Sequence, residues 1–146
     1  MIATELRAPA SRYQAPEAPD LSDPGGRRRL TAPAVRAMGR LADAWQLTVE
    51  ETCALLGGVP ASTWHSWRSS PPADLGIDRL MRVSYLLGIY TALHALHQGE
   101  LADAWVRRPN TNPLFDGRSP LAAMITGGIP TMVEVRALLD GRRGGM

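Results

Sequence analysis

Two histidines carry the clearest potential for chemistry in this sequence. His94 and His97 lie three residues apart, which places both imidazoles on one face of a helix at a spacing used by metal ligands. Two histidines make an incomplete metal site, and no third ligand is evident. We therefore interpret them as ordinary surface or core residues. A small metal-dependent enzyme remains an alternative that elemental analysis for bound metal would decide.

Other arrangements typical of an active site are missing from the sequence. There is no Ser-His-Asp signature, no pair of carboxylates placed for acid–base work and no phosphate-binding glycine loop. The single cysteine, Cys53, excludes an internal disulfide and cysteine-rich zinc modules. We predict a protein that is not an enzyme, with no catalytic residue, no metal and no cofactor.

Length and composition indicate one modest globular domain with a tail. The chain has 146 residues, of which 45% are hydrophobic and 21% charged. No apolar run reaches the roughly 18 residues that a membrane span requires, and the N-terminus has no cationic segment followed by an apolar core. We expect a cytoplasmic protein without membrane contact.

The charge is unusual in kind. All 16 basic residues are arginine, which fits a genome with biased base composition and also fits selection for forked contacts to phosphate or carboxylate. The net charge of +2 is too small to indicate a nucleic-acid partner by itself.

Helical patterns fill the chain after an N-terminal arm. Residues 1–30 contain four prolines, a glycine pair and no apolar periodicity, so we expect them to be disordered, ending in the run Arg27-Arg28-Arg29. Residues 31–73 form an expected helix-turn-helix domain, and residues 74–146 a long helix followed by a C-terminal helical domain. The predicted fold class is therefore all-α, without strands.

The helix-turn-helix prediction rests on the signals that begin and end three short helices. Thr31 and Pro33 begin the first, a capping box of Thr48 and Glu51 begins the second, and Gly57-Gly58 forms the turn. Pro60 begins the third, with Ala61 and Trp64 facing inward. The outward positions are the candidates for DNA contact: Ser62, Thr63, His65, Ser66 and Arg68.

Charge within this segment is balanced. Residues 31–73 contain three arginines (Arg36, Arg40 and Arg68) and three acidic residues (Asp43, Glu50 and Glu51). Such a unit binds DNA weakly unless it is dimeric or assisted by the arginine run. A free-standing transcriptional regulator is an alternative function, and a gel-shift salt titration on its own promoter would decide it.

The remaining helices follow one long apolar element. Asp74 is expected to cap a helix over 75–97 that is apolar around most of its circumference and therefore buried on most sides. A short helix over 100–106, a loop over 110–117 and a helix beginning at Ser119-Pro120 come next. The last helix is expected from Pro130 to Gly141.

The connecting string Trp105-Val106-Arg107-Arg108-Pro109-Asn110, followed by Asn112 to Leu121, carries the most specific signal. A buried tryptophan can anchor a loop, asparagine can fix a turn, and glycine permits a left-handed backbone. The string resembles the toxin-binding domain of Xre/MbcA/ParS-type antitoxins, and the order of the upstream helices agrees with it. Its motif positions are Trp105, Pro109, Asn110, Gly117, Ser119 and Pro120.

The resemblance implies a partner and a mechanism. Members of this family neutralise a RES-domain toxin, which consumes NAD or transfers ADP-ribose from it, by covering its active site with their C-terminal region. Here that region is about 132–146, with Arg136, Arg142, Arg143 and Met146 as toxin-contact candidates. The N-terminal helices are implied to dimerise and to bind operator DNA for autorepression. We expect a homodimer or a hetero-oligomer with the toxin.

Overall fold

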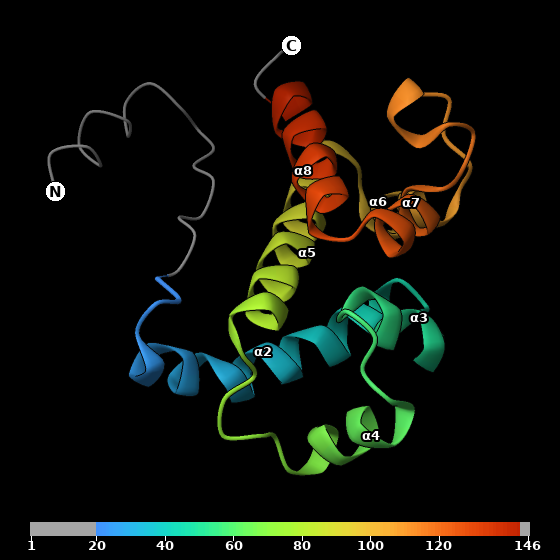
Figure 1. Ribbon diagram of the computed structural model, residues 1–146. Coiled ribbons are helices and arrows are strands. Elements are labelled where there is room, and N and C mark those ends of the chain that lie inside the picture. The colour runs from blue at the N-terminus through green and yellow to red at the C-terminus, as the bar shows by residue number, and fades with distance from the viewer. Residues whose placement is uncertain (1–19, 144–146) are drawn as a thin grey trace, which may run out of the picture.

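Residues 20–143 are described by the computed structural model, and they form an all-α fold with no strand among them, as predicted (Figure 1). None of the helices in that range is long and apolar enough to cross a membrane. The elements in chain order are α2 (Pro24–Ala44), α3 (Val49–Leu55), α4 (Ala61–Ser69), α5 (Ile77–Leu96), α6 (Gly99–Ala104), the 3₁₀ turns η1 (Trp105–Arg107) and η2 (Pro113–Phe115), α7 (Pro120–Gly127) and α8 (Ile129–Arg143).

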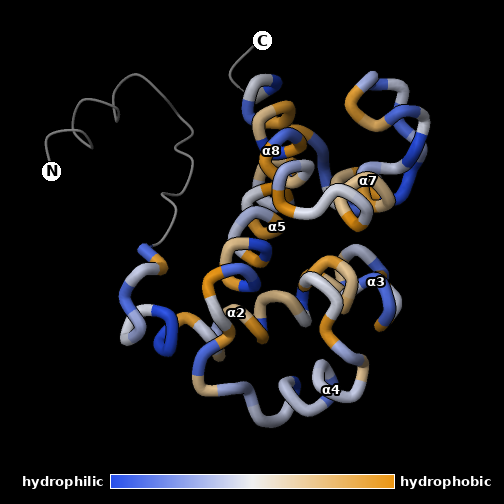
Figure 2. The backbone as a smooth tube through the Cα atoms, in the orientation of Figure 1, coloured by the Kyte–Doolittle hydropathy of each residue, from blue (hydrophilic) through white to orange (hydrophobic). Residues whose placement is uncertain are grey.

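The central helix α5 joins two layers. Helices α2, α3 and α4 lie together at one end of α5, while α6 and α8 pack against α5 itself and α7 lies against α8 and α3 (Figure 1). Leu86, Ile89 and Leu93 of α5 are fully buried, and hydrophobic residues recur along α5 (Figure 2). The prediction of a long helix buried on most sides is confirmed, and one continuous core runs through the described residues.

The first helix begins at Pro24 and not at Thr31. The carboxylate of Asp23 accepts hydrogen bonds from the N–H groups of Gly25 and Gly26, at 3.3 and 3.1 Å, and Pro24 occupies the favoured first position. Pro33 lies inside the helix. Disorder was therefore the wrong prediction for residues 24–30, while residues 1–19 of the expected arm lie outside the described residues.

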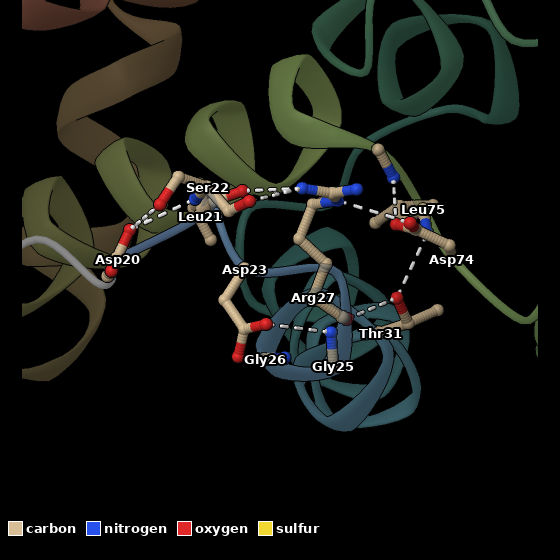
Figure 3. A network of polar contacts seen from close by, with 11 residues as sticks. Asp20, Leu21, Ser22, Asp23, Gly25, Gly26, Arg27, Thr31, Asp74 and Leu75 are labelled. Carbon is tan, nitrogen blue, oxygen red and sulfur yellow. Dashed lines mark hydrogen bonds and ion pairs between the residues drawn. The ribbon is translucent and has the colours of Figure 1, made fainter.

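A polar network ties the start of α2 to the loop before α5 (Figure 3). The Nε of Arg27 donates to Oδ2 of Asp74 at 3.1 Å, and its Nη1 donates to the carbonyl oxygen of Leu21 at 2.8 Å. Thr31 Oγ1 donates to the carbonyl of Arg27 at 2.8 Å and accepts from the buried N–H of Leu75 at 2.9 Å. Arg27, expected in a solvated run, is a structural residue whose side chain is 17% exposed.

Asp74 does not cap the long helix directly. Helix α5 begins at Ile77, behind Gly76 at φ 94°, and Asp74 Oδ1 accepts from the N–H of Gly76 at 2.9 Å. This backbone hydrogen bond, together with the hydrogen bond and charge of Arg27 and the charge of Arg28, lowers the pKa of Asp74 despite the opposing effect of burial. The carboxylate therefore fixes the sharp turn into α5.

Several predicted helix ends are confirmed, and two details are wrong. The Thr48–Glu51 capping box forms, and Ser119 caps α7, which Gly128 ends at φ 66°. Helix α8 continues through Gly141 to Arg143, because a glycine weakens a helix without forcing it to end. Trp64 is buried as expected, but Ala61 is exposed, since it lies in the first turn of α4, at the edge of the core.

The hydroxyl of Thr31 provides a test of this network. Thr31→Val keeps the shape but leaves the N–H of Leu75 buried without an acceptor, which we expect to lower the free energy of unfolding by about 1–3 kcal/mol in urea denaturation. The control is Thr91→Val, because the exposed Thr91 hydroxyl bonds only the carbonyl of Leu87 in its own helix. Equal losses in the two variants would contradict the role of Thr31.

Candidate functional site

The loop between α6 and α7 is anchored by two aromatic side chains. Phe115 is fully buried, and the ring of Trp105 meets it edge to face, with centroids 5.8 Å apart and an interplanar angle of 81°. Such pairs add to the free energy of apolar burial. The expected anchoring role of Trp105 therefore depends on a partner, Phe115, that lies ten residues further along the chain.

Hydrogen bonds within the loop fix its backbone. Asn110 Oδ1 accepts from the N–H of Asn112, and Asn112 Oδ1 accepts from the N–H of Leu114, both at 2.9 Å. The N–H of Asn110 donates to the carbonyl of Arg118 at 3.1 Å, which closes the loop. Gly117 has φ 79°, as predicted, and Asp116 is also left-handed at φ 51°. The loop projects away from the helices in a defined shape (orange in Figure 1).

The start of α7 follows directly from this closure. Ser119 Oγ accepts from the N–H of Ala122 at 3.1 Å, and Pro120 is buried at the first helical position. Pro109 lies exposed where the loop leaves η1. Five of the six motif residues therefore shape the loop and the start of α7, while Pro109 lies exposed beside them.

Helix α8 divides into a buried face and an outward face. Met132, Val135 and Leu139 are fully buried, and α8 packs along α5. On the opposite face Glu134 and Ala137 are exposed, together with Val133, whose exposed fraction is 41%. The outward face of α8 therefore offers a mixed apolar and acidic surface to a partner.

The predicted contact residues near the C-terminus have different surroundings. The side chain of Arg136 is only 15% exposed and its Nε lies 3.0 Å from Oδ2 of Asp140; its guanidinium also crosses α5 at Gly88, where a Cβ would collide with it. Arg142 is exposed. Arg143 ends α8, and Met146 lies outside the described residues.

The predicted DNA-contact residues lie together on α4. Ser62, His65, Ser66 and Arg68 are exposed and Thr63 is partly exposed, whereas Trp64 is buried. The turn before α4 contains Gly57 and Gly58 at φ 93° and 97°, values that suit glycine. The sequence pattern therefore located the exposed face of α4 correctly, while contact with DNA stays a prediction.

An ion pair joins the N-terminal helices to the C-terminal unit. Arg107 of η1 donates from Nη1 and Nη2 to the two carboxylate oxygens of Glu51 in α3, at 3.0 and 3.4 Å. Glu51 also accepts from the N–H of Thr48. Burial raises the pKa of Glu51, but the bonds from Arg107 and Thr48 outweigh it, so the net shift is downward. The sequence assigned Glu51 to the capping box but carried no signal for a partner 56 residues away.

The two histidines do not share a helical face. Helix α5 ends at Leu96, and His97 has an extended backbone at φ −132° and ψ 159°. His94 stacks against Tyr90, with ring centroids 4.2 Å apart, and its Nε2 lies 2.8 Å from Oδ1 of Asp103. Within residues 20–143 no group of three His, Cys, Asp or Glu side chains could hold a metal ion.

Comparison with known proteins places residues 92–145 in the family described as the antitoxin Xre/MbcA/ParS C-terminal toxin-binding domain. These residues comprise the end of α5, the anchored loop and helices α6 to α8. The chain is also similar to the uncharacterized protein y4oB of Sinorhizobium fredii (strain NBRC 101917 / NGR234). The two are 38% identical over 112 residues, which cover 76% of this chain and 84% of the relative.

The Glu51–Arg107 pair predicts a pH dependence of stability. Because the folded pKa of Glu51 is lowered, its stabilising contribution is present above the unfolded pKa and is lost as the pH falls through and below that value. We expect Glu51→Gln to cost about 1 kcal/mol at pH 7, and the difference from wild type to shrink below about pH 4. Thermal unfolding between pH 3 and 7 measures this.

Glu50→Gln is the matched control, because Glu50 lies exposed in the same first turn of α3. If both substitutions gave the same pH profile, general helix–charge effects would explain the result and the specific pair would not.

Proposed function

Because this chain belongs to the Xre/MbcA/ParS antitoxin family, we propose that it neutralises a RES-domain toxin, one that consumes NAD or transfers ADP-ribose from it, by covering the toxin's active site. The observation that carries the proposal is the match of residues 92–145 to a toxin-binding domain. In this proposal these residues act by binding the toxin and excluding its substrate, and the chain is not an enzyme.

A preformed surface favours this mechanism. The loop over 108–118 is held by Phe115 and by its own hydrogen bonds, and α8 is held on α5 by Met132, Val135 and Leu139. Rigid elements lose little conformational entropy on binding. We place the toxin contact on the outward face of α8 and the residues that follow it.

The contact candidates take different roles in this proposal. Arg142, Arg143 and Met146 are assigned to contact with acidic or nucleotide-binding groups of the toxin, because guanidinium groups pair strongly with such anions. Arg136, held by Asp140 and passing over Gly88, positions α8 against α5 and offers the toxin only the edge of its guanidinium.

The N-terminal layer serves dimerisation and operator binding in the same proposal. A mostly apolar groove runs between α2 and α5, lined in part by Leu30, Pro33, Ala37, Val83 and Leu87, and a second copy of the chain would cover it. The exposed face of α4 would then read operator DNA for autorepression. All of these interactions take place in the cytoplasm.

A free-standing transcriptional regulator is the second candidate function. The observation that favours it is the exposed polar face of α4, which carries Ser62, His65 and Ser66 above the buried Trp64. In this alternative the C-terminal unit would bind no toxin.

Co-expression with the toxin encoded by the adjacent gene tests the proposal. We expect the wild-type chain to restore growth and to elute with the toxin in size exclusion. The double variant Arg142→Glu and Arg143→Glu should weaken the complex roughly 10- to 100-fold in calorimetry, because two charge-assisted contacts are lost. Arg28→Glu with Arg29→Glu reverses two charges on α2, where both arginines are exposed, and serves as the control.

The outcomes separate the alternatives. No complex and no rescue by the wild-type chain would overturn the antitoxin proposal, and strong operator binding in that case would favour the regulator. Equal weakening by the two double variants would show that the toxin contact lies elsewhere than at the end of α8.

A further inference from the structure

We propose that Arg36 and Arg68, called here the arginine cluster, bind the phosphate backbone of duplex DNA, and that Gly39 is the residue that positions Arg68 for this contact. The inference rests on the operator binding proposed above and deepens it by naming the residues that carry the charge-dependent part of the affinity.

Arg68 of α4 lies flat across α2. A Cβ at Gly39 would be 2.9 Å from Cζ of Arg68, 3.0 Å from Nη2 and 3.1 Å from Nε. On the same α4 helix the guanidinium carbon also lies 5.3 Å from the centroid of the Trp64 ring. Gly39 is buried and Arg68 is exposed. Because Gly39 has no side chain, the guanidinium of Arg68 can lie between the backbone of α2 and the indole of Trp64.

Arg36 extends this positive surface along α2. It precedes Gly39 by three residues and is exposed, whereas Arg40 lines the groove between α2 and α5. Positions three apart on a helix are neighbours on its surface, so Arg36 and Gly39 adjoin. Asp43 is the nearest acid in this part of α2, and no ion pair joins it to the cluster among the described residues. The cluster therefore has no carboxylate partner in residues 20–143.

Other arginines of this chain contrast with the cluster. Arg27 and Arg107 pair with carboxylates elsewhere in the fold, and Arg82 and Arg136 each pair with a carboxylate one turn away in the same helix. Neither Arg36 nor Arg68 has such a partner among residues 20–143, so both charges are available to an anion. A guanidinium fork with its carbon stem already packed matches phosphate oxygens and loses little side-chain entropy on binding.

The place of the cluster suits a DNA backbone contact. Arg68 lies on α4 beside the exposed residues Ser62, His65 and Ser66, so one short helix carries both a phosphate contact and candidate base contacts. Phosphate contacts fix the position of a protein on DNA, and base contacts specify the sequence. The run Arg27-Arg28-Arg29 suits this role less well than its charge indicates, because Arg27 is held by Asp74.

The test is a titration of the full-length protein with a fluorescent duplex of its own promoter at several salt concentrations. Each phosphate contact contributes about 0.9 to the slope of log K against log salt. We expect Arg68→Gln and Arg36→Gln each to reduce the slope by about 0.9. Gly39→Ala keeps every charge but displaces the Arg68 guanidinium, and we expect it to weaken binding about 3- to 10-fold.

Arg28→Gln is the matched control, since Arg28 is exposed on the same helix outside the cluster, and its slope should equal that of wild type. Alanine also favours the helix over glycine, and circular dichroism verifies folding of each variant. If Gly39→Ala and Arg68→Gln both kept the wild-type slope and affinity, the inference about the arginine cluster would be overturned. Operator binding itself would still stand. A wild-type protein that does not bind the duplex would overturn operator binding as well, while toxin binding by the same sample would leave the antitoxin function standing.

Discussion

Burial of α5 on opposite sides is the constraint on which the structure depends. One side of the helix packs against α2 and another against α8, and Leu86, Ile89 and Leu93 are fully buried between them. Each such side chain contributes about 1.5–3 kcal/mol when it leaves water. The proposed DNA-binding and toxin-binding layers are therefore built on one helix. Unfolding of α5 would expose the core of both.

Arginine side chains add geometric precision to this apolar framework. Arg27 fixes the start of α2 to the loop before α5, and Arg107 joins η1 to α3. Ion pairs at a surface contribute modestly to stability, so their value here is orientation: the forked contact of Arg107 with Glu51 holds the C-terminal unit in one position against the N-terminal helices.

Local signals explain what could be predicted from the sequence. The capping box at Thr48, the cap at Ser119 and the left-handed Gly117 each depend on residues within a few positions, and the apolar pattern of α5 indicates burial without a partner being known. The helix start at Pro24 was not predicted, because Pro24, Gly25 and Gly26 have low helix propensity and the helix forms there only with the cap from Asp23. Arg27–Asp74 and Glu51–Arg107 join residues 47 and 56 positions apart, and only the folded chain brings them together.

The most direct measurement is hydrogen–deuterium exchange of the chain alone and in complex with the toxin encoded beside it. If the C-terminal unit covers the toxin's active site, exchange should slow over α8 and the residues after it, with α4 unchanged. Slower exchange confined to α2, α3 and α4, with α8 exchanging as in the free protein, would contradict the proposed antitoxin mechanism.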